Sequence, residues 1–351
     1  MTQPVSITIF GGGGFVGRYL VRALVKTVSS PGGAAADGWH RIRIVARDAE
    51  RVRREWNASR DAVIARVSLS GSVSFVSADV ANEEAVRRAL DPMPQSVVNL
   101  AGILYETPPW QTFERVHVQG AENIAQAVSG QRDTIVTQVS AIGADFTAAD
   151  SQYARSKGLA EEALHSHLGG RVVLLRPSVI FGEEDQLFRR FRDMARLSPF
   201  LPLVGGGWTR FQPVHVEDVA QALLRCVLPE RRAQRVQRSV GDGESLDEPR
   251  HLYELGGRDV VTFREMMEKL LQVTGMRRLL LPIPFTVAEW QASAFEAVHR
   301  LVPGIPPLLT HDQVAMLRRD NVVSPGACGL TELGVEAPRG LDAVSLAYLA
   351  R

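Results

Sequence analysis

The sequence predicts an α/β protein with a doubly wound parallel sheet and a smaller, mostly helical region at its C-terminal end. Nearly continuous apolar runs of strand length recur along the first half, as is typical of parallel strands covered on both faces. Amphipathic segments of helical period separate these runs, and a glycine-rich turn joins the first run to the first helix. The runs are residues 5–10, 41–46, 73–77, 96–100, 134–139 and 171–176.

The chain is expected to divide near residue 250. Residues 1–250 are predicted to form the sheet domain, with polar insertions near residues 26–40 and 228–251. Residues 251–351 are predicted to form the smaller region, which would cover a cleft or an interface and contain a helix near residues 262–274.

Composition and charge indicate a globular protein and argue against nucleic-acid binding and against a transmembrane segment. The 351 residues are 45% hydrophobic and 23% charged, as in ordinary globular proteins. A formal net charge of +1 provides no general attraction for nucleic acid, so no nucleic-acid partner is expected. The two cysteines lie far apart in the sequence, and no apolar run approaches the roughly 20 residues of a transmembrane segment. No signal peptide is visible ahead of the first strand.

The stretch ITIFGGGGFVGRYL predicts a dinucleotide-binding loop. Gly11, Gly14 and Gly17 follow the spacing G-x-x-G-x-x-G between a strand and a helix. Such glycines allow a tight turn, a close approach to a pyrophosphate and close packing of the helix on the strand. Gly12 and Gly13 are expected to fill the turn only and to accept a less flexible residue. The flanking strand and helix favour a Rossmann-like site over a plain βα turn.

The end of the second strand predicts which dinucleotide binds. An acidic side chain there suits the ribose of NAD(H), whereas arginine suits the 2′-phosphate of NADP(H). Arg47 ends this strand and Arg18 adds a second cation, so NADPH is expected; NADH is the alternative, because Asp48 comes next. Further cofactor contacts are expected from Phe15, Val16, Asp79, Val80, Ala101 and Gly102.

The segment YARSK predicts a catalytic or cofactor-facing pair. Tyr153 and Lys157 are four residues apart, hence on one face of a helix, and Ser140 ends the preceding strand. In a reductase the tyrosine exchanges a proton with a carbonyl, the ammonium lowers its pKa and binds the nicotinamide ribose, and the serine orients the substrate oxygen. The alternative is a solvated helix face.

The chain resembles the extended short-chain dehydrogenase/reductase superfamily over nearly its whole length. Besides the glycine loop and the Tyr-Lys pair, LRPSVIFG and FQPVHVEDVA carry this resemblance. One branch is more similar: the NADPH-binding accessory subunits of respiratory complex I, which are atypical members, and their bacterial relatives. The matching segments include FGGGGFVGRYLVRAL, VNLAGILYE, VSAIGAD, YARSKGLAE, YELGG followed by TFREMM, and DQVAMLRRDNVVS.

This resemblance implies a tightly held NADPH with a structural role, no established turnover, and docking onto other complex I subunits near the junction with the membrane arm. It implies that Pro177 and Ser178 line the nicotinamide, and that Ser140, Tyr153 and Lys157 are catalytic residues, active or vestigial. His117 stands where the superfamily often has asparagine. The expected location is the matrix side of the mitochondrial inner membrane, or else the cytoplasmic face of a bacterial inner membrane. The alternative function is an active NADPH-dependent reductase or nucleotide-sugar epimerase or dehydratase that uses the same three residues.

Other segments have simpler interpretations. FRRFRDMARL is either an amphipathic helix over the cleft, whose arginines contact an acidic partner or phospholipid headgroups, or a solvated basic helix. The apolar segment 279–302 is either a contact surface for a protein or a membrane, or part of a small core. Metal binding is not expected, because His165 and His167 point to different helix faces and Asp218 beside a packed His215 is expected to cap a helix.

Overall fold

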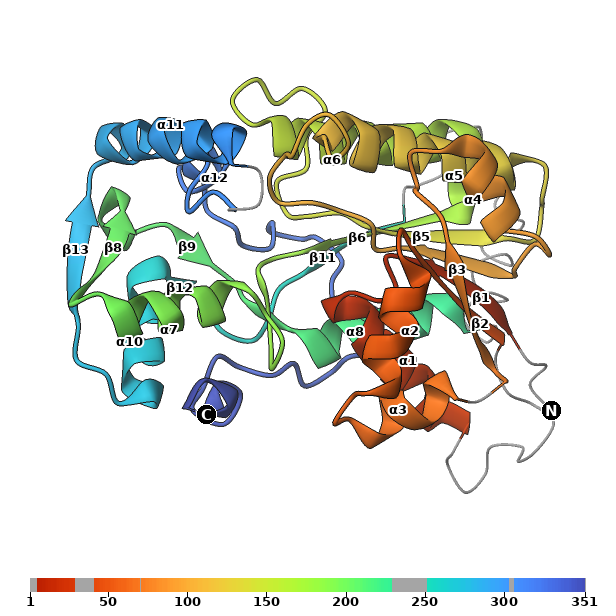
Figure 1. The fold of residues 1–351 in the computed structure, drawn as a ribbon, viewed down its shortest axis with the longest axis horizontal. Helices are drawn as coiled ribbons and strands as arrows, with labels where there is room; N and C mark the ends of the chain where they lie inside the picture. Colours follow the sequence, from red (N-terminus) through yellow and green to blue (C-terminus); the bar gives the residue numbers. More distant parts are fainter. Residues whose placement is uncertain (1–4, 29–40, 70, 229–250, 303–305, 351) are drawn as a thin grey trace.

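The computed structural model describes residues 5–28, 41–69, 71–228, 251–302 and 306–350. Its centre is a seven-stranded sheet with the order β11-β6-β5-β4-β1-β2-β3, in which every pairing is parallel (Figure 1). The strands are β1 (Ser6–Phe10), β2 (Arg41–Ala46), β3 (Val73–Ser77), β4 (Ser96–Asn99), β5 (Ile135–Val139), β6 (Val172–Pro177) and β11 (His251–Leu255). The predicted doubly wound parallel sheet is confirmed.

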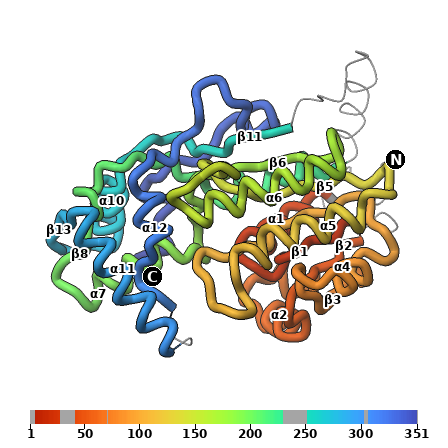
Figure 2. Tube along the Cα trace, turned by 90° about the horizontal axis from the view of Figure 1, so that it is seen from above, coloured from red at the N-terminus to blue at the C-terminus, as the bar shows by residue number. Residues whose placement is uncertain are grey.

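Helices cover both faces of the sheet, which explains why its strands are apolar almost throughout. Along β1, Ile7 and Ile9 belong to the core on one face, whereas Phe10 belongs to the core on the other. One layer contains α1 (Phe15–Val28), α2 (Ala49–Asn57), α3 (Ala62–Ser68) and α8 (Val216–Val227), and the opposite layer contains α4 (Glu83–Ala89), α5 (Gly120–Ser129) and α6 (Gln152–Leu168) (Figures 1 and 2).

The strand order reverses at β1. From β1 the chain runs outward through β2 to β3, and then returns to the opposite side of β1 with β4. In doubly wound sheets, ligands bind at the carboxyl ends of the strands where this reversal occurs. The loops after β1 and β4 meet here, since a Cβ on Gly11 would lie 3.0 Å from the amide nitrogen of Ala101.

The smaller region lies at the other end of the molecule from the outer strands β2 and β3 (Figure 1). Four helices and a short 3-10 turn build most of it: α7 (Leu187–Leu197), α10 (Phe263–Thr274), α11 (Phe285–Leu301), α12 (His311–Met316) and η4 (Ala347–Ala350). Short strands pair around them: β8 (Phe200–Val204) with β13 (Leu279–Ile283), β9 (Arg210–Phe211) with β12 (Val261–Thr262), and β7 (Ile180–Phe181) with β10 (Val214–His215). A mostly helical region, with the predicted helix at 263–274, is confirmed.

The division near residue 250 stays a prediction. The strand β11 opens the range 251–351 yet pairs with β6 in the central sheet, whereas Phe188 of α7 and Leu201 of β8 share a core with α10. Most of both predicted insertions, residues 29–40 and 229–250, lies outside the described residues.

Candidate functional site

The predicted site residues gather at the carboxyl edge of the sheet. This follows from the topology, because the βα loops of parallel strands all leave from one edge. Tyr153 and Lys157 occupy the first two turns of α6, directly beyond the loop that follows β5. The residues at the strand ends are Gly11 after β1, Arg47 after β2, Asp79 after β3, Ala101 and Gly102 after β4, Ser140 after β5 and Ser178 after β6.

The glycine loop is a tight turn that leads into α1. Gly11 adopts a left-handed backbone with φ +71°, which favours glycine. Its N–H donates to the carbonyl of Val45 over 2.9 Å, and the N–H of Gly14 donates to the carbonyl of Gly11 over 3.0 Å. The turn therefore delivers the N-terminus of a 14-residue helix to the strand edge, as a pyrophosphate site requires.

The two glycines expected to be filler are closely packed. A Cβ on Gly13 would lie 2.6 Å from a methyl group of Val52, and one on Gly12 would lie 3.0 Å from the carbonyl oxygen of Ile9. The expectation that Gly13 accepts a less flexible residue is wrong, because Val52 of α2 occupies the space that a Cβ needs. For Gly12 the expectation stays a prediction, and Ile9 of β1 and Ile44 of β2 leave a Cβ little room there. A Cβ on Gly17 would collide with the backbone of Gly12, so close helix packing requires glycine there.

The first turn of α1 places Phe15 and Val16 half-buried at the edge. Arg18 follows, and its guanidinium lies 3.2 Å from a carboxylate oxygen of Glu184 and 3.5 Å from one of Glu55. The Arg18 guanidinium, which was predicted to contact a phosphate, is therefore already paired with two carboxylates.

Arg47 and Asp48 have different environments. Asp48 is the N-cap of α2, where its Oδ1 accepts a hydrogen bond from the N–H of Arg51 over 2.9 Å. Arg47 is exposed at the end of β2. The carboxylate that would favour an unphosphorylated ribose is therefore engaged in capping, and the arginine remains at the edge.

Asp79 and Val80 form the turn after β3. The Oδ1 of Asp79 accepts from the N–H of Ala81 over 3.0 Å, and the carbonyl of buried Val80 accepts from Nδ2 of Asn123 over 2.9 Å. These bonds fix the turn against α5 at the edge where an adenine is predicted to lie.

Ser140, Tyr153 and Lys157 form the predicted catalytic group. The buried Oγ of Ser140 has no hydrogen-bond partner among the described residues. The Nζ of buried Lys157 lies 3.4 Å from the carbonyl oxygen of Val139, and burial lowers its pKa to about 8 against the opposing charge of Glu161. Burial raises the pKa of Tyr153 to about 12, so its phenol is protonated at neutral pH and can donate a hydrogen bond.

These groups fit a nicotinamide dinucleotide. A glycine cradle and a helix N-terminus suit the pyrophosphate, and the unpartnered Ser140 hydroxyl and the Lys157 ammonium are polar groups that a bound ligand would satisfy. The roles of the individual residues remain predictions.

Residues 310–324, here called the strap, cross the part of the site where the nicotinamide is predicted to lie; they contain the motif DQVAMLRRDNVVS, to which the sequence analysis gave no role in the site. Ser178, buried after Pro177, donates from Oγ to Oδ1 of Asn321 over 2.6 Å, and Nδ2 of Asn321 donates to the carbonyl of Ile142 over 3.3 Å. At the start of α6, Oδ1 of Asp312 accepts from the N–H of Tyr153 over 3.1 Å. The strap thus holds three of the loops and helices that carry site residues.

The N-terminal cap of α8 differs from the sequence prediction. His215, not Asp218, caps α8, because its Nδ1 accepts from the N–H of Glu217 over 3.2 Å. Asp218 instead accepts from the backbone N–H of Arg339 over 2.7 Å and pairs with its guanidinium. The partner lies more than a hundred residues away, so no local pattern indicates it.

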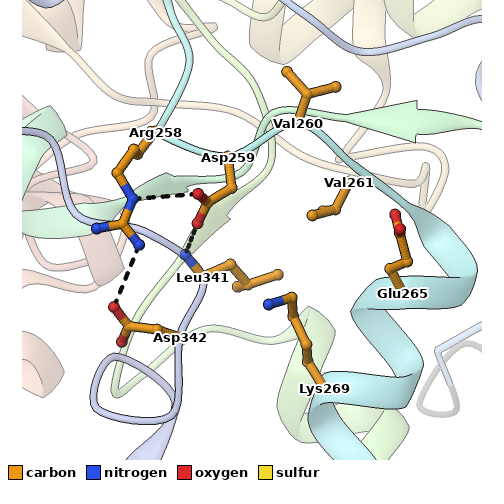
Figure 3. A pocket seen from close by; sticks show the side chains of 8 residues that line it. All are labelled: Arg258, Asp259, Val260, Val261, Glu265, Lys269, Leu341 and Asp342. Atoms are coloured by element: carbon orange, nitrogen blue, oxygen red, sulfur yellow. Dashed lines mark hydrogen bonds and ion pairs between the residues drawn. The ribbon is translucent and has the colours of Figure 1, made fainter.

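A polar hollow of about 510 Å³ lies in the smaller region, apart from this edge (Figure 3). Arg258 pairs there with Asp259 and Asp342, and Asp259 also accepts from the N–H of Leu341. Within the described ranges, no group of three or more His, Cys, Asp or Glu side chains is arranged to hold a metal ion. None of the helices in those ranges has the length and apolar character needed to cross a bilayer.

Comparisons with known proteins agree with the predicted resemblance. Subunit 9 of the mitochondrial NADH dehydrogenase (ubiquinone) 1 alpha subcomplex of Arabidopsis thaliana is 29% identical over 347 residues, which cover 97% of this chain and 76% of the relative. The mitochondrial NADH-ubiquinone oxidoreductase 40 kDa subunit of Neurospora crassa is 26% identical over 334 residues, 94% of this chain and 75% of the relative. A ceramide reductase of Caulobacter vibrioides is 30% identical over 220 residues, 62% of this chain and 59% of that protein.

Solved structures and a family match define the fold family. UDP-glucose 4-epimerase of Thermus thermophilus, solved in complex with NAD, superposes with a TM-score of 0.61 at 17% identity and covers 98% of both chains. Residues 7–238 match the family described as NAD dependent epimerase/dehydratase family. This match spans well over half of the sequence, and the chain belongs to the NAD dependent epimerase/dehydratase family.

Proposed function

We propose that this chain is an accessory subunit of NADH:ubiquinone oxidoreductase that holds NADPH as part of its structure. The observation that carries the proposal is the end-to-end likeness to the Arabidopsis thaliana subunit, which covers 97% of this chain and so extends through the smaller region. The strap supports a structural role for the nucleotide, because it ties α6 and the ends of β5 and β6 together beside the nicotinamide end. The partners are then other complex I subunits.

NADPH is favoured over NADH by the end of β2. Arg47 is exposed there, while the carboxylate of Asp48 caps α2. A guanidinium and a phosphate dianion form strong, charge-assisted hydrogen bonds. Arg47→Ser is expected to weaken NADPH binding about tenfold to a hundredfold and to change NADH binding little. Isothermal titration of both nucleotides tests this, and an equal loss for both would rule out a 2′-phosphate contact.

The docking face is proposed to include the outer side of α11 together with β13. Val287, Trp290, Val298 and Leu301 are exposed along this helix, with Trp290 and Leu301 each 83% exposed. Such a contiguous apolar face, at the end of the molecule remote from the outer strands, suits a partner subunit or a membrane surface. The protein would then be peripheral on the matrix side of the mitochondrial inner membrane, or on the cytoplasmic face in a bacterium.

Native purification from the source membrane tests the proposal directly. Mass spectrometry of the co-purifying proteins and of the nucleotide released on unfolding is expected to find complex I subunits and stoichiometric NADPH. Protein that is purified from the membrane without any nucleotide, or that separates from complex I throughout purification, would contradict the proposed role.

The second candidate is an active NADPH-dependent reductase, epimerase or dehydratase. The unpartnered Oγ of Ser140, beside the Tyr153–Lys157 pair, favours it because such a hydroxyl can orient a substrate carbonyl. Under this function, added carbonyl substrates oxidise bound NADPH, and Tyr153→Phe abolishes the oxidation while the nucleotide stays bound. Absence of oxidation with both ceramide-like ketones and nucleotide 4-keto-sugars would leave the structural role.

A further inference from the structure

A buried histidine joins two parts of the predicted nicotinamide site. The side chain of His117 is 2% exposed and lies between the loop after β4 and helix α6. Its Nε2 accepts a hydrogen bond from the N–H of Ile103 over 3.0 Å, and its Nδ1 lies 2.8 Å from Oγ of Ser156. One imidazole therefore connects the loop that carries Gly102 to the helix that carries Tyr153 and Lys157.

The neighbours of the imidazole determine its tautomer. Because Nε2 accepts from Ile103, the ring proton sits on Nδ1 and is donated to Ser156, whose own hydroxyl donates to the carbonyl of Tyr153 over 2.9 Å. Burial and the neighbouring Lys157 ammonium lower the pKa of His117 to about 2. The ring is neutral across the physiological range, so it adds no positive charge beside Lys157.

Packing against neighbouring aromatic rings holds the His117 imidazole in the orientation that these hydrogen bonds require. His117 stacks on Phe113 at 5.4 Å between ring centroids and 25° between planes, and it meets Tyr153 edge-on at 5.6 Å and 83°. It lies in a π-helical turn, Glu114–Gln119, immediately before α5. Such turns recur at functional sites because they redirect a side chain out of the helical register.

The connected parts meet at one point of the site. A Cβ on Gly102 would lie 3.2 Å from Nζ of Lys157 and 3.5 Å from Nε2 of His117. A shift of this loop relative to α6 would therefore change the distance between the Gly102 backbone and the Lys157 ammonium, both of which are predicted to contact the cofactor.

We propose that His117 is a positioning residue for the nicotinamide half of the dinucleotide: as a neutral bridge it holds the backbone at Gly102 and Ile103 in register with Tyr153 and Lys157. The inference rests on the dinucleotide binding proposed above. It also assigns a role to Ser156, the serine of YARSK, as the acceptor that keeps the imidazole proton on Nδ1.

Binding measurements with two ligands distinguish a positioning role of His117 from a general loss of structure in its variants. NADPH contacts the whole site, whereas adenosine 2′,5′-bisphosphate lacks the nicotinamide half. His117→Phe keeps the ring stack but leaves the Ile103 N–H unpaired, so it is expected to weaken NADPH binding about tenfold to a hundredfold and to leave the bisphosphate within about twofold of wild type. Arg47→Ser is the matched control and is expected to weaken both ligands.

Conservative variants complete the experiment. His117→Gln is expected to recover part of the affinity for NADPH, because its Oε1 can accept from Ile103. Ser156→Ala, which avoids any change in ring packing, is expected to give a smaller loss that is again confined to NADPH. Equal weakening of both ligands in the His117 and Ser156 variants, or no change in NADPH binding, overturns the positioning role. Wild-type protein that binds neither ligand overturns the dinucleotide function itself.

Discussion

Gly14 ends the glycine loop and Gly17 lies in the first turn of α1, and a side chain at each would meet different neighbours. At Gly17 a Cβ would run into the backbone of Gly12, whereas at Gly14 the nearest atom is the carbonyl oxygen of Gly11 at 3.2 Å. Backbone atoms cannot move aside as a flexible side chain can. Gly17→Ala is therefore expected to lower the free energy of unfolding by about 1–3 kcal/mol, as overpacking does. Urea denaturation of the nucleotide-free protein measures this.

Gly14→Ala provides the matched comparison. Its backbone φ is not left-handed, so the added methyl group is expected to change the free energy of unfolding by less than about 1 kcal/mol. Binding of the pyrophosphate would suffer instead, since the predicted ligand approaches this backbone. An equal loss of stability in both variants would contradict this division between packing and binding.

At this scale the sequence predicted the residues whose roles follow from local spacing. G-x-x-G-x-x-G and Y-x-x-x-K place Gly11 and Lys157 at one edge because every βα unit leaves the sheet on the same side. The expectation for Gly13 failed because its neighbour, Val52, comes from α2. The sequence near Asp218 also does not show that its carboxylate accepts a hydrogen bond from Arg339 and does not cap a helix.

At the scale of elements, the start of α6 depends on the strap. Ser151 caps this helix, since its Oγ accepts from the N–H of Ala154 over 3.1 Å and donates to Asp312 over 2.6 Å. Asp312 also accepts from the N–H of Tyr153, so a carboxylate of the smaller region lies at the positive end of the helix dipole. Tyr153 is thus held by an element more than 150 residues further along the chain.

Asp312→Ala is expected to lower the free energy of unfolding by about 1–2 kcal/mol, because the Tyr153 N–H and the Ser151 hydroxyl lose their acceptor. Bound nucleotide is expected to dissociate faster, as α6 becomes less firmly held. Arg319→Ala is the control: its ion pair with Asp150 is solvent-exposed and should contribute less than about 0.5 kcal/mol. Chemical denaturation and stopped-flow release of NADPH fluorescence measure both effects, and equal behaviour of the two variants would mean that the strap does not support α6.

The sequence predicted six of the seven strands of the sheet, because these strands and their amphipathic helices carry strong periodic signals. The seventh strand, β11, contains a histidine and a glutamate and lies in the range that was assigned to the smaller region. The smaller region was predicted only in outline. Its strand pairs join β8 to β13 and β9 to β12 across long stretches of chain, and β9 and β12 have two residues each. Pairings of that kind are determined by tertiary packing, which a window of sequence does not contain.

At the scale of the whole molecule, the composition gives a formal net charge of +1, but it does not show which charged side chain is buried and therefore destabilises the folded protein. Lys157 is 5% exposed, and within the protein its ammonium has the Val139 carbonyl at 3.4 Å as a hydrogen-bond acceptor and Glu161 as an opposing charge. A buried charge with so little compensation opposes folding. The predicted ligand would supply ribose oxygens to this ammonium, so a residue that destabilises the empty protein would stabilise the loaded one.

The pH dependence of stability follows from the same lysine. Its pKa falls from the ordinary 10.5 to about 8 on folding. Below about pH 8 both states carry the proton and the full penalty is present; between about pH 8 and 10.5 the unfolded state binds more protons, so this contribution rises with pH until the penalty disappears. Lys157→Met is therefore expected to raise the free energy of unfolding at pH 7 by about 1–3 kcal/mol.

The difference between Lys157→Met and the wild type isolates this one group, because all other titrations cancel. Urea denaturation of both nucleotide-free proteins from pH 7 to 10.5 is expected to show the advantage of the variant shrinking towards zero as the wild-type lysine loses its proton. Saturating NADPH is expected to reverse the order at pH 7, since only the wild type has an ammonium for the ribose. A pH-independent difference would show that side-chain packing, not the buried charge, separates the two proteins.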